Sequence, residues 1–516
     1  MVASLLRVIY GGIQDSRFLC QKGKPNIRFF VKAIIRAGRF TTQWVRLDFD
    51  KLPTLGTTSV ITLPRKGHLI SRLYLVTTLP DIATPQLAAA DWCTANGKTF
   101  AGPTFGWTNS VGHALLQSAT IDIGGSRVEQ IDGRLLEVLD EFYTPLEKVS
   151  IMDKLLPRNS SNFTPDQFGS TTATIATTPL PFWFSSGDAG TFLPIDALQA
   201  DPVKLSIQFR TAGTIYTSTG QMSTDNILSP PIGGEAYFPI ATSPFYYNDP
   251  SGTPVAGLHY GYPSDTTLVS PIPNITMPTT QSLQVLGDTY IMAEYIYLDA
   301  PEANRFRLAD IQVPVLQHYA FDPVDTKGGA SANCYLKIPN PTRNLFFYLQ
   351  RYEAPYYNAP FLATRDLSGA GTATPWWPNA SNIDTRVYTH LIPGFVDRNS
   401  EPVSAIDLIY EGKLYRYSTT TPSVFRSLIP IKKTPWLHRY YYNLPFALQS
   451  GFLPPSQPCG EGNLDKIVNI NLKVELAPLA GYTTTYNVPR YLVHVWAETY
   501  NIFRVYGGRG GMMFAY

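Results

Sequence analysis

The chain has 516 residues, more than one hydrophobic core usually organises, so its length alone predicts two or more domains. Charged residues make up only 16% of it, while 31 Tyr, 27 Phe and 43 Pro favour a β-rich protein that buries much surface against neighbours. The formal net charge of +2 is too small to indicate a nucleic-acid-binding or polybasic membrane protein.

The basic residues are concentrated at the start of the chain. Residues 1–41 carry eight Lys and Arg side chains against the single acid Asp15, an excess of seven, which leaves a formal charge of minus five on the remainder. The eight are Arg7, Arg17, Lys22, Lys24, Arg28, Lys32, Arg36 and Arg39. We therefore expect a basic N-terminal arm. The alternative is that its apolar residues pack against the first domain with the charges solvated; these are Ile27, Phe29, Phe30 and Ile34.

The cysteine spacing and the absence of a targeting segment from the sequence indicate in which kind of compartment the protein is found. No apolar run reaches the roughly 18 to 20 residues of a membrane span, and the first residues lack the apolar segment and cleavage site of a signal peptide. Cys20, Cys93, Cys334 and Cys459 lie far apart without a C-x-x-C pair, so neither a zinc site nor a disulfide framework is expected. A reducing compartment is the simplest interpretation.

Strand patterns recur along the chain, and long helical patterns do not. Residues 44–49, 203–210 and 468–476 alternate apolar and polar side chains with a period of two, which predicts strands with one face on a core. Short helices are predicted at 134–142 and 301–311, the second with Pro in its first turn. The chain is therefore predicted to be mostly β.

The glycine pair Gly124-Gly125 follows the first part of the run IDIGGSRV. A dinucleotide-binding loop would need a third glycine and a following helix, because the helix N-terminus supplies the amide donors. Neither is indicated, and the alternation continues through Val128. We therefore predict a tight hairpin, in which glycine supplies positive φ angles.

Two long segments, 211–283 and 352–390, are rich in Pro, Gly, Ser, Thr and Tyr and show little alternation, so they are predicted surface loops. They contain the pairs Tyr246-Tyr247, Tyr356-Tyr357 and Trp376-Trp377, which could stack on sugars. A carbohydrate- or receptor-binding β-sandwich is therefore the alternative function.

An internal repeat accounts for the glycine hairpin. Three segments of the first half recur roughly 260 to 290 residues later, as expected for two β-sandwiches of common ancestry. They are LPFWF at 180–184 with LPFAL at 444–448, the strand at Val203 with the strand at Val468, and the hairpin at 118–127 with the hairpin at 404–413.

Seven short segments, which follow one another in the same order along the chain, resemble segments of a known family. They are residues 10–15 (YGGIQD), 25–30 (PNIRFF), 61–80 (ITLPRKGHLISRLYLVTTLP), 107–115 (WTNSVGHAL), 180–184 (LPFWF, with LP at 193–194), 293–299 (AEYIYLD) and 498–505 (ETYNIFRV, followed by glycines). In these segments the chain resembles the double jelly-roll major capsid proteins of the nucleocytoplasmic large DNA viruses. It departs from the family in the predicted loops, notably at 211–283.

The resemblance implies an all-β fold of two consecutive eight-stranded jelly rolls with long inter-strand loops. The expected order is an arm at 1–41, a first jelly roll at 42–298 that contains the loop 211–283, a linker with a short helix at 299–311, and a second jelly roll at 312–516. A jelly roll buries its hydrophobic faces by packing two sheets together, which allows its loops to lengthen.

The resemblance also implies a structural function. Three copies would form a homotrimer of pseudo-hexagonal outline, and neighbouring capsomers would tile an icosahedral shell over an internal membrane. Minor capsid or cement proteins are the implied partners, with the internal viral membrane reached through the basic arm, and no direct genome binding is expected. The implied location is the virion capsid, assembled in the host cytoplasm.

No catalytic, cofactor or metal residues are predicted, and the chain is expected not to be an enzyme. A glycosidase would need two carboxylates across a cleft, whereas the adjacent Asp140 and Glu141 are expected to be solvated on a short helix. The histidines show no metal-binding spacing, and His113 and His494 are expected to be packed or hydrogen-bonded. The full set is His68, His113, His259, His318, His390, His438 and His494.

The two glycines of the single Arg-Gly-Gly run that begins at Arg509 are too few for an RNA-binding segment. We expect them to let the C-terminal tail pass close to another backbone, because glycine has no side chain to keep the two apart.

Overall fold

The structure is a computed structural model that describes residues 39–80, 104–158, 175–211, 214–219, 286–351, 360–361, 363, 365, 401–428, 440–448, 460–478, 488 and 490–514. The chain divides into two compact units, Met1–Phe40 and Thr41–Tyr516. Of the first unit only Arg39 and Phe40 are described, so nearly all of the predicted basic arm lies outside the described residues. None of the helices in the described ranges is long and apolar enough to cross a membrane.

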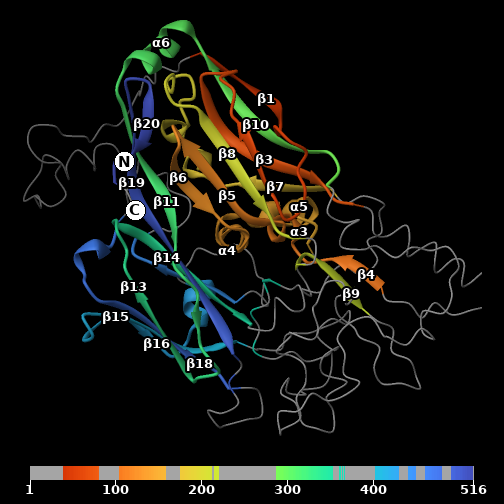
Figure 1. The fold of residues 1–516 in the computed structure, drawn as a ribbon. Coiled ribbons are helices and arrows are strands. Elements are labelled where there is room, and N and C mark those ends of the chain that lie inside the picture. Colours follow the sequence, from red (N-terminus) through yellow and green to blue (C-terminus); the bar gives the residue numbers. More distant parts are fainter. Residues whose placement is uncertain are drawn as a thin grey trace, which may run out of the picture. The chain divides into compact units, whose positions relative to one another are not determined.

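Eight strands of the first half form two four-stranded sheets (Figure 1). The order in one sheet is β1-β10-β3-β7 and in the other β2-β8-β5-β6, which is the strand order of a jelly roll. Their bounds are β1 Phe40–Asp48, β2 Thr58–Thr62, β3 Leu69–Thr78, β5 Leu116–Ile123, β6 Ser126–Ile131, β7 Ile175–Leu180, β8 Val203–Phe209 and β10 Thr289–Leu298.

The second half repeats this arrangement with the orders β11-β19-β14-β17 and β13-β18-β15-β16. Two short strands, β12 and β20, add to β19. The bounds are β11 Ile311–Ala320, β12 Val324–Asp325, β13 Ser331–Leu336, β14 Thr342–Arg351, β15 Val403–Tyr410, β16 Leu414–Thr419, β17 Tyr441–Pro445, β18 Ile470–Leu476, β19 Tyr491–Tyr506 and β20 Arg509–Met512. The chain is therefore a double jelly roll, as the resemblance implied.

The helices are short and lie in the connections between strands. They are α3 Val111–Ala114, α4 Gly133–Tyr143, α5 Val149–Leu155 and α6 Ala300–Leu308, with the 3-10 helices η2 Leu146–Lys148, η3 Trp183–Ser185, η4 Ala189–Thr191 and η9 Leu464–Lys466 and the π-helix η8 Val424–Leu428. The helix predicted at 301–311 is confirmed but ends at Leu308, and Ile311 already begins β11. Helix α6 thus lies in sequence between the two jelly rolls.

The predicted loops fall largely outside the described residues. In the segment 211–283 the structure describes a short strand, β9 (Tyr216–Thr219), which pairs with β4 (Thr104–Trp107) in a separate two-stranded sheet. In the segment 352–390 it describes only 360, 361, 363 and 365. The tyrosine and tryptophan pairs proposed to stack on sugars all lie outside the described ranges.

Alternating side chains of each strand form the core between the two sheets. In β8, Val203, Leu205, Ile207 and Phe209 are buried while the residues between them face outward. Strand β18 shows the same alternation, as its period-two pattern predicted. Each fully buried aliphatic or aromatic side chain contributes roughly 1.5–3 kcal/mol relative to exposure, so these alternating rows stabilise both sandwiches.

The predicted glycine hairpin is confirmed. Gly124 and Gly125 have φ angles of 60° and 86° and connect the antiparallel strands β5 and β6. The matching turn between β15 and β16 also has two positive φ angles, 50° at Glu411 and 70° at Gly412. Positive φ at both central residues is characteristic of the tight turns that join two strands, so the repeat extends to the backbone of the turn.

Candidate functional site

Among the described residues, buried polar side chains gather around Glu137 and around Glu498. No group of three or more His, Cys, Asp or Glu side chains in the described ranges is placed to hold a metal ion. Buried charge is costly unless it is paired, so each charged side chain in these networks needs partners inside the protein.

Helix α4 supplies the first network. Its N-cap, Asp132, accepts a 2.6 Å hydrogen bond from the backbone N–H of Leu135, which satisfies one of the free donors at the helix start. Most of the helix is buried, and Glu137 has no exposed surface. The carboxylate of Glu137 must therefore find its partners inside the protein.

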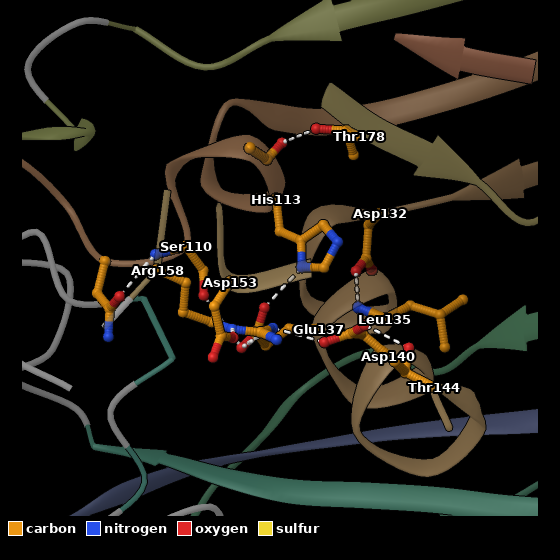
Figure 2. A network of polar contacts seen from close by, with 12 residues as sticks. Ser110, His113, Asp132, Leu135, Glu137, Asp140, Thr144, Asp153, Arg158 and Thr178 are labelled. Carbon is orange, nitrogen blue, oxygen red and sulfur yellow. Dashed lines mark hydrogen bonds and ion pairs between the residues drawn. The ribbon is translucent and has the colours of Figure 1, made fainter. Parts of the chain in front are cut away.

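Three side chains approach Glu137 (Figure 2). The ring Nδ1 of His113 lies 2.6 Å from Oε2, and the Ser110 hydroxyl donates a hydrogen bond of 3.2 Å to Oε1. The Arg158 guanidinium adds an ion pair at 3.6 Å. His113 is thus buried and hydrogen-bonded, as the sequence predicted.

Arg158 links α4 to α5. Its Nη1 lies 2.5 Å from Oδ2 of Asp140, and its Nε lies 2.8 Å from Oδ1 of Asp153 (Figure 2). Thr144 donates a further hydrogen bond of 2.6 Å to Asp140. The expectation that Asp140 and Glu141 are solvated is wrong: Asp140 pairs with a buried arginine, and Glu141 is itself buried. The reason is that most of α4 is buried, since it contacts Arg158 on one side and Phe346 of the second jelly roll on another.

The second network lies at the seam where the first jelly roll meets the second. Tyr143, the last residue of α4, donates a hydrogen bond of 2.8 Å to Oε1 of Glu498 on β19. Asn344 on β14 donates one of 2.5 Å to Oε2. Burial, together with the Glu498 carboxylate, raises the pKa of the Tyr143 phenol well above its usual 10.0, so the hydroxyl stays protonated as the donor.

His318 connects a carboxylate from each jelly roll. Its Nδ1 lies 3.2 Å from Oε1 of Glu129 on β6, and its Nε2 lies 3.8 Å from Oε1 of Glu498. Burial opposes its protonation, but the hydrogen bond to Glu129 and the charges of Glu129 and Glu498 outweigh burial and raise the pKa of His318. His318 therefore lies between a carboxylate of each jelly roll, and these contacts favour its protonated form more than in a free histidine.

Neutral contacts extend the seam. The Gln317 amide donates a 2.7 Å hydrogen bond to the Val128 carbonyl of the first jelly roll, and Asn501 donates one of 2.7 Å to the Gln317 amide oxygen. The rings of Phe142 and Phe346 lie 5.6 Å apart between their centroids. The seam thus combines aromatic packing with hydrogen bonds between neutral polar groups.

The C-terminal glycines also lie at the seam. The backbone N–H of Ala200 donates a 2.9 Å hydrogen bond to the carbonyl of Gly508. A Cβ atom on Gly508 would lie 3.3 Å from the Ala200 nitrogen, and one on Gly510 would lie 2.4 Å from Cδ2 of Leu198. The close approach to another backbone therefore occurs at Gly508, which precedes Arg509. The prediction for the two glycines after Arg509 is wrong, because Gly510 lies against the Leu198 side chain and nothing lies within 4 Å of a Cβ atom on Gly511.

Of the remaining histidines, His494 is buried in the second jelly roll and its Nε2 lies 2.9 Å from the Gln350 amide oxygen. Burial and the positive charges of Arg134 and Arg210 lower its pKa well below 6.5, so it is neutral. This confirms the prediction of a hydrogen-bonded His494. Nδ1 of His68 accepts a hydrogen bond of 2.8 Å from the backbone N–H of Leu298. The other three, His259, His390 and His438, lie outside the described residues.

Comparison with known proteins gives a family for part of the chain. Residues 28–240 match the family described as "Major capsid protein N-terminus". The chain is 26% identical over 221 residues to Probable capsid protein 4 of Acanthamoeba polyphaga mimivirus, covering 42% of this chain and 39% of the relative. It is 25% identical over 221 residues to the Major capsid protein of Pyramimonas orientalis virus, covering 43% of this chain and 50% of the relative. These alignments span half or less of each relative.

Solved structures extend the likeness to nearly the whole chain. The PBCV-1 virus capsid subunit matches with a TM-score of 0.63 and 19% identity, covering 95% of this chain and 100% of that one. The Faustovirus major capsid protein matches with a TM-score of 0.60 and 10% identity, covering 93% of both chains. At such identities the likeness is one of fold, and it includes both jelly rolls.

Proposed function

Because the chain belongs to the major capsid proteins of the nucleocytoplasmic large DNA viruses, we propose that it is a structural subunit, not an enzyme, of an icosahedral virus shell. Three copies form a capsomer of pseudo-hexagonal outline, and capsomers tile the shell. The observation that carries this proposal is the buried polar seam, which joins the two jelly rolls into one building block.

A shell subunit needs a fixed arrangement of its two jelly rolls, and the polar contacts of the seam hold them in one arrangement. Glu498 receives donors from α4 and β14, while His318 bridges Glu129 and Glu498. Breaking a buried pair of this kind leaves an uncompensated charge, which is strongly destabilising. The two jelly rolls are therefore expected to move as one body.

The exposed side chains favour self-association. Large aromatic and aliphatic residues remain at the surface of the isolated chain in both jelly rolls, including Trp44, Tyr335, Leu414, Tyr415 and Leu428. Aromatic residues are enriched at protein interfaces, and Lys and Glu are depleted there. A chain with 13% aromatic and only 16% charged residues has the composition of a protein surrounded by copies of itself.

The proposal extends to the binding partners of the basic arm and to the location of the protein. Minor capsid or cement proteins and the internal viral membrane are the proposed partners of the basic arm, whose excess of seven positive charges supports an anionic counterpart. We place the protein in the virion capsid, with assembly in the host cytoplasm, and no contact with the genome is proposed.

The oligomeric state of the purified protein tests the proposal. Native mass spectrometry should report mainly trimers at micromolar concentration, and electron microscopy should show particles of hexagonal outline. A monomer in both measurements would overturn the proposal. Glycan-array binding by the same sample would instead support the carbohydrate-binding alternative.

A further inference from the structure

Two arginines of the first jelly roll, Arg134 and Arg210, lie close to one another at the seam. Arg134 is the second residue of helix α4, and Arg210 directly follows strand β8. Both residues are half-buried. Burial, followed by the positive charge of Arg134, lowers the pKa of Arg210 from its usual value to about 10. The two guanidinium groups therefore repel each other in surroundings that already disfavour charge.

Aromatic side chains of the second jelly roll lie beside this pair. The ring of Tyr348 on β14 is stacked with those of His494 and Trp496 on β19, with centroid separations of 5.3 and 5.9 Å. Burial lowers the pKa of His494, and both arginines lower it further. Burial raises the pKa of Tyr348, and both arginines act against that rise. The two positive charges therefore act on side chains from both jelly rolls.

The nearby acid does not neutralise the pair. Among the described residues, Asp132 is the acidic side chain whose negative charge acts on Arg210. Its Oδ1 accepts the backbone N–H of Leu135 at 2.6 Å, and its Oδ2 accepts the ring N–H of Trp496 at 3.3 Å. In the part of the chain that the structure describes, neither arginine forms an ion pair. Two guanidinium groups thus stand against one carboxylate that is bonded elsewhere.

The hydrogen-bond donors of the pair are also poorly used. Nε of Arg134 is buried and has no hydrogen-bond partner, and the side chain otherwise interacts with the neutral hydroxyl of Tyr348. Nε of Arg210 donates a long bond of 3.4 Å to the Leu116 carbonyl. Each guanidinium has five N–H donors. Because buried charge is costly unless it is paired, the cluster needs a counter-ion.

We propose that Arg134 and Arg210 together bind one small oxyanion of the phosphate class. A guanidinium donates two parallel N–H bonds to the oxygens of such an ion, and it does so more strongly than to a neutral acceptor. The ion supplies the negative charge that Asp132 does not give to either arginine. This binding site goes beyond the structural role in the shell and does not depend on the oligomeric state.

A bound anion also has a consequence for stability. Helix α4 and strand β8 belong to the first jelly roll, whereas Tyr348 and His494 belong to the second. The site exists only when the two are folded together, so an anion that binds there stabilises the folded chain over the unfolded one. The seam is then held by an ion as well as by the contacts of Glu498.

The test uses the full chain with inorganic phosphate as the probe. Isothermal titration calorimetry measures binding at constant ionic strength, with chloride as the reference anion, because salt screens all charges alike. Arg134→Gln and Arg210→Gln each remove one guanidinium. Arg127→Gln is the control, since it removes the same charge from an exposed arginine on β6. Circular dichroism verifies the fold of each variant, and Arg210→Lys is a second variant that keeps the charge but not the planar fork.

We expect one phosphate to bind per chain in the unsubstituted protein and in Arg127→Gln. Each of the two variants Arg134→Gln and Arg210→Gln should bind at least about tenfold more weakly, and Arg210→Lys should fall between. Phosphate should raise the midpoint of thermal unfolding of the unsubstituted chain and of the control, and leave that of the two glutamine variants unchanged.

Tripolyphosphate distinguishes two sources of the same chemistry. Tighter binding than phosphate, lost in the same two variants, identifies a phosphate group of a larger molecule, whereas equal or weaker binding identifies the free ion. The inference is overturned when the folded, unsubstituted chain binds no phosphate, or when both glutamine variants bind it as tightly as the control. Binding that leaves the unfolding midpoint of the unsubstituted chain unchanged also overturns it, because the ion then lies outside the seam.

Discussion

The hydroxyl of Tyr143 donates a hydrogen bond of 2.8 Å to the carboxylate of Glu498, although 355 residues separate the two in the chain. Asn344 donates to the other carboxylate oxygen, so both oxygens of a buried anion have a donor. Tyr143 comes from the first jelly roll and Glu498 from the second. The bond therefore makes the stability of each jelly roll depend on the other.

Replacing Tyr143 by phenylalanine tests this dependence. The substitution keeps the ring that packs against Phe346 but removes the donor, which leaves one oxygen of the buried Glu498 carboxylate without its hydroxyl partner. We expect the free energy of unfolding to fall by roughly 1–3 kcal/mol. Denaturant titration measures it. The matched control is Tyr335→Phe, at a tyrosine 72% exposed, which should match the unsubstituted chain. Equal stability of the two variants would contradict the role of the bond.

His318 gives the seam a dependence on pH. The pKa of His318 is raised above 6.5, so its protonated form stabilises the folded chain; this contribution is fully present below 6.5 and is lost as pH rises through the raised pKa. We expect His318→Gln to lower the free energy of unfolding most at about pH 6, and less as pH increases above the raised pKa. Denaturant titrations at a series of pH values measure the difference between the two chains.

His494 makes the stability fall at low pH, whereas His318 makes it fall at high pH, but His494 does not change the difference between the two chains. Its pKa is lowered, so its contribution is lost as pH falls below 6.5, and this occurs equally in the unsubstituted chain and in His318→Gln. Only the difference between the two chains reports on His318. A difference that stays constant or grows as pH rises would show that His318 is not held protonated.

Gly133, the first residue of α4, allows the helix to approach the preceding segment. A Cβ atom there would lie 2.1 Å from the His113 carbonyl oxygen and 2.6 Å from that of Leu116, so backbone would have to move. We expect Gly133→Ala to destabilise the chain by roughly 1–3 kcal/mol or more. Thermal unfolding measures this. Gly511→Ala is the control, since nothing lies within 4 Å of its added atom. A Gly133→Ala chain as stable as this control would disprove the steric argument.

The elements that the sequence predicted are those with a local signal. The alternation at 203–210 and 468–476 places strands β8 and β18 within two residues, because period-two burial is a property of each strand alone. The glycine hairpin was predicted correctly as well, because a tight turn with positive φ angles favours glycine at its central positions. The matching motifs at 180–184 and 444–448 begin at the ends of the corresponding strands β7 and β17.

The seam had no such signal. No spacing rule links Tyr143 to Glu498, and a glutamate in a strand looks the same whether it faces water or a second domain. The expectation for Asp140 and Glu141 failed for the same reason: adjacent acids on a short helix indicate exposure locally, whereas Arg158 and the rest of the fold bury them. Functional residues at contacts between domains are thus the ones that pattern alone misses.

The proposed domain boundary near residues 299–311 can be tested by limited proteolysis. Cleavage should occur first within 211–283 or 352–390, while strands β3 and β18 stay protected by their sheets. Because the seam contains buried polar pairs, the fragments should remain associated under native conditions. Early cuts within 61–79 or 467–476 would contradict the assignment of these segments to the two cores.

The basic arm gives the last prediction, which concerns membranes. Deleting residues 1–24 removes Arg7, Arg17, Lys22 and Lys24 together with Asp15. Each basic side chain near an anionic membrane contributes about 1 kcal/mol, and salt screens this attraction. We therefore expect the truncated chain to form trimers but to be impaired in shell assembly or in binding to anionic vesicles at low salt. Vesicle flotation, with neutral lipid as the control, measures the loss.

A second variant separates charge from chain length. Changing the four basic residues Arg7, Arg17, Lys22 and Lys24 to glutamine keeps the arm but removes four of its eight positive charges. Because Asp15 is kept, this variant should weaken vesicle binding at least as much as the deletion does. Both variants keep the apolar residues Ile27, Phe29, Phe30 and Ile34, so an arm that merely packs against the first jelly roll would be unaffected. If both variants bind anionic vesicles and assemble like the full chain at low salt, the charge asymmetry has no part in membrane attachment.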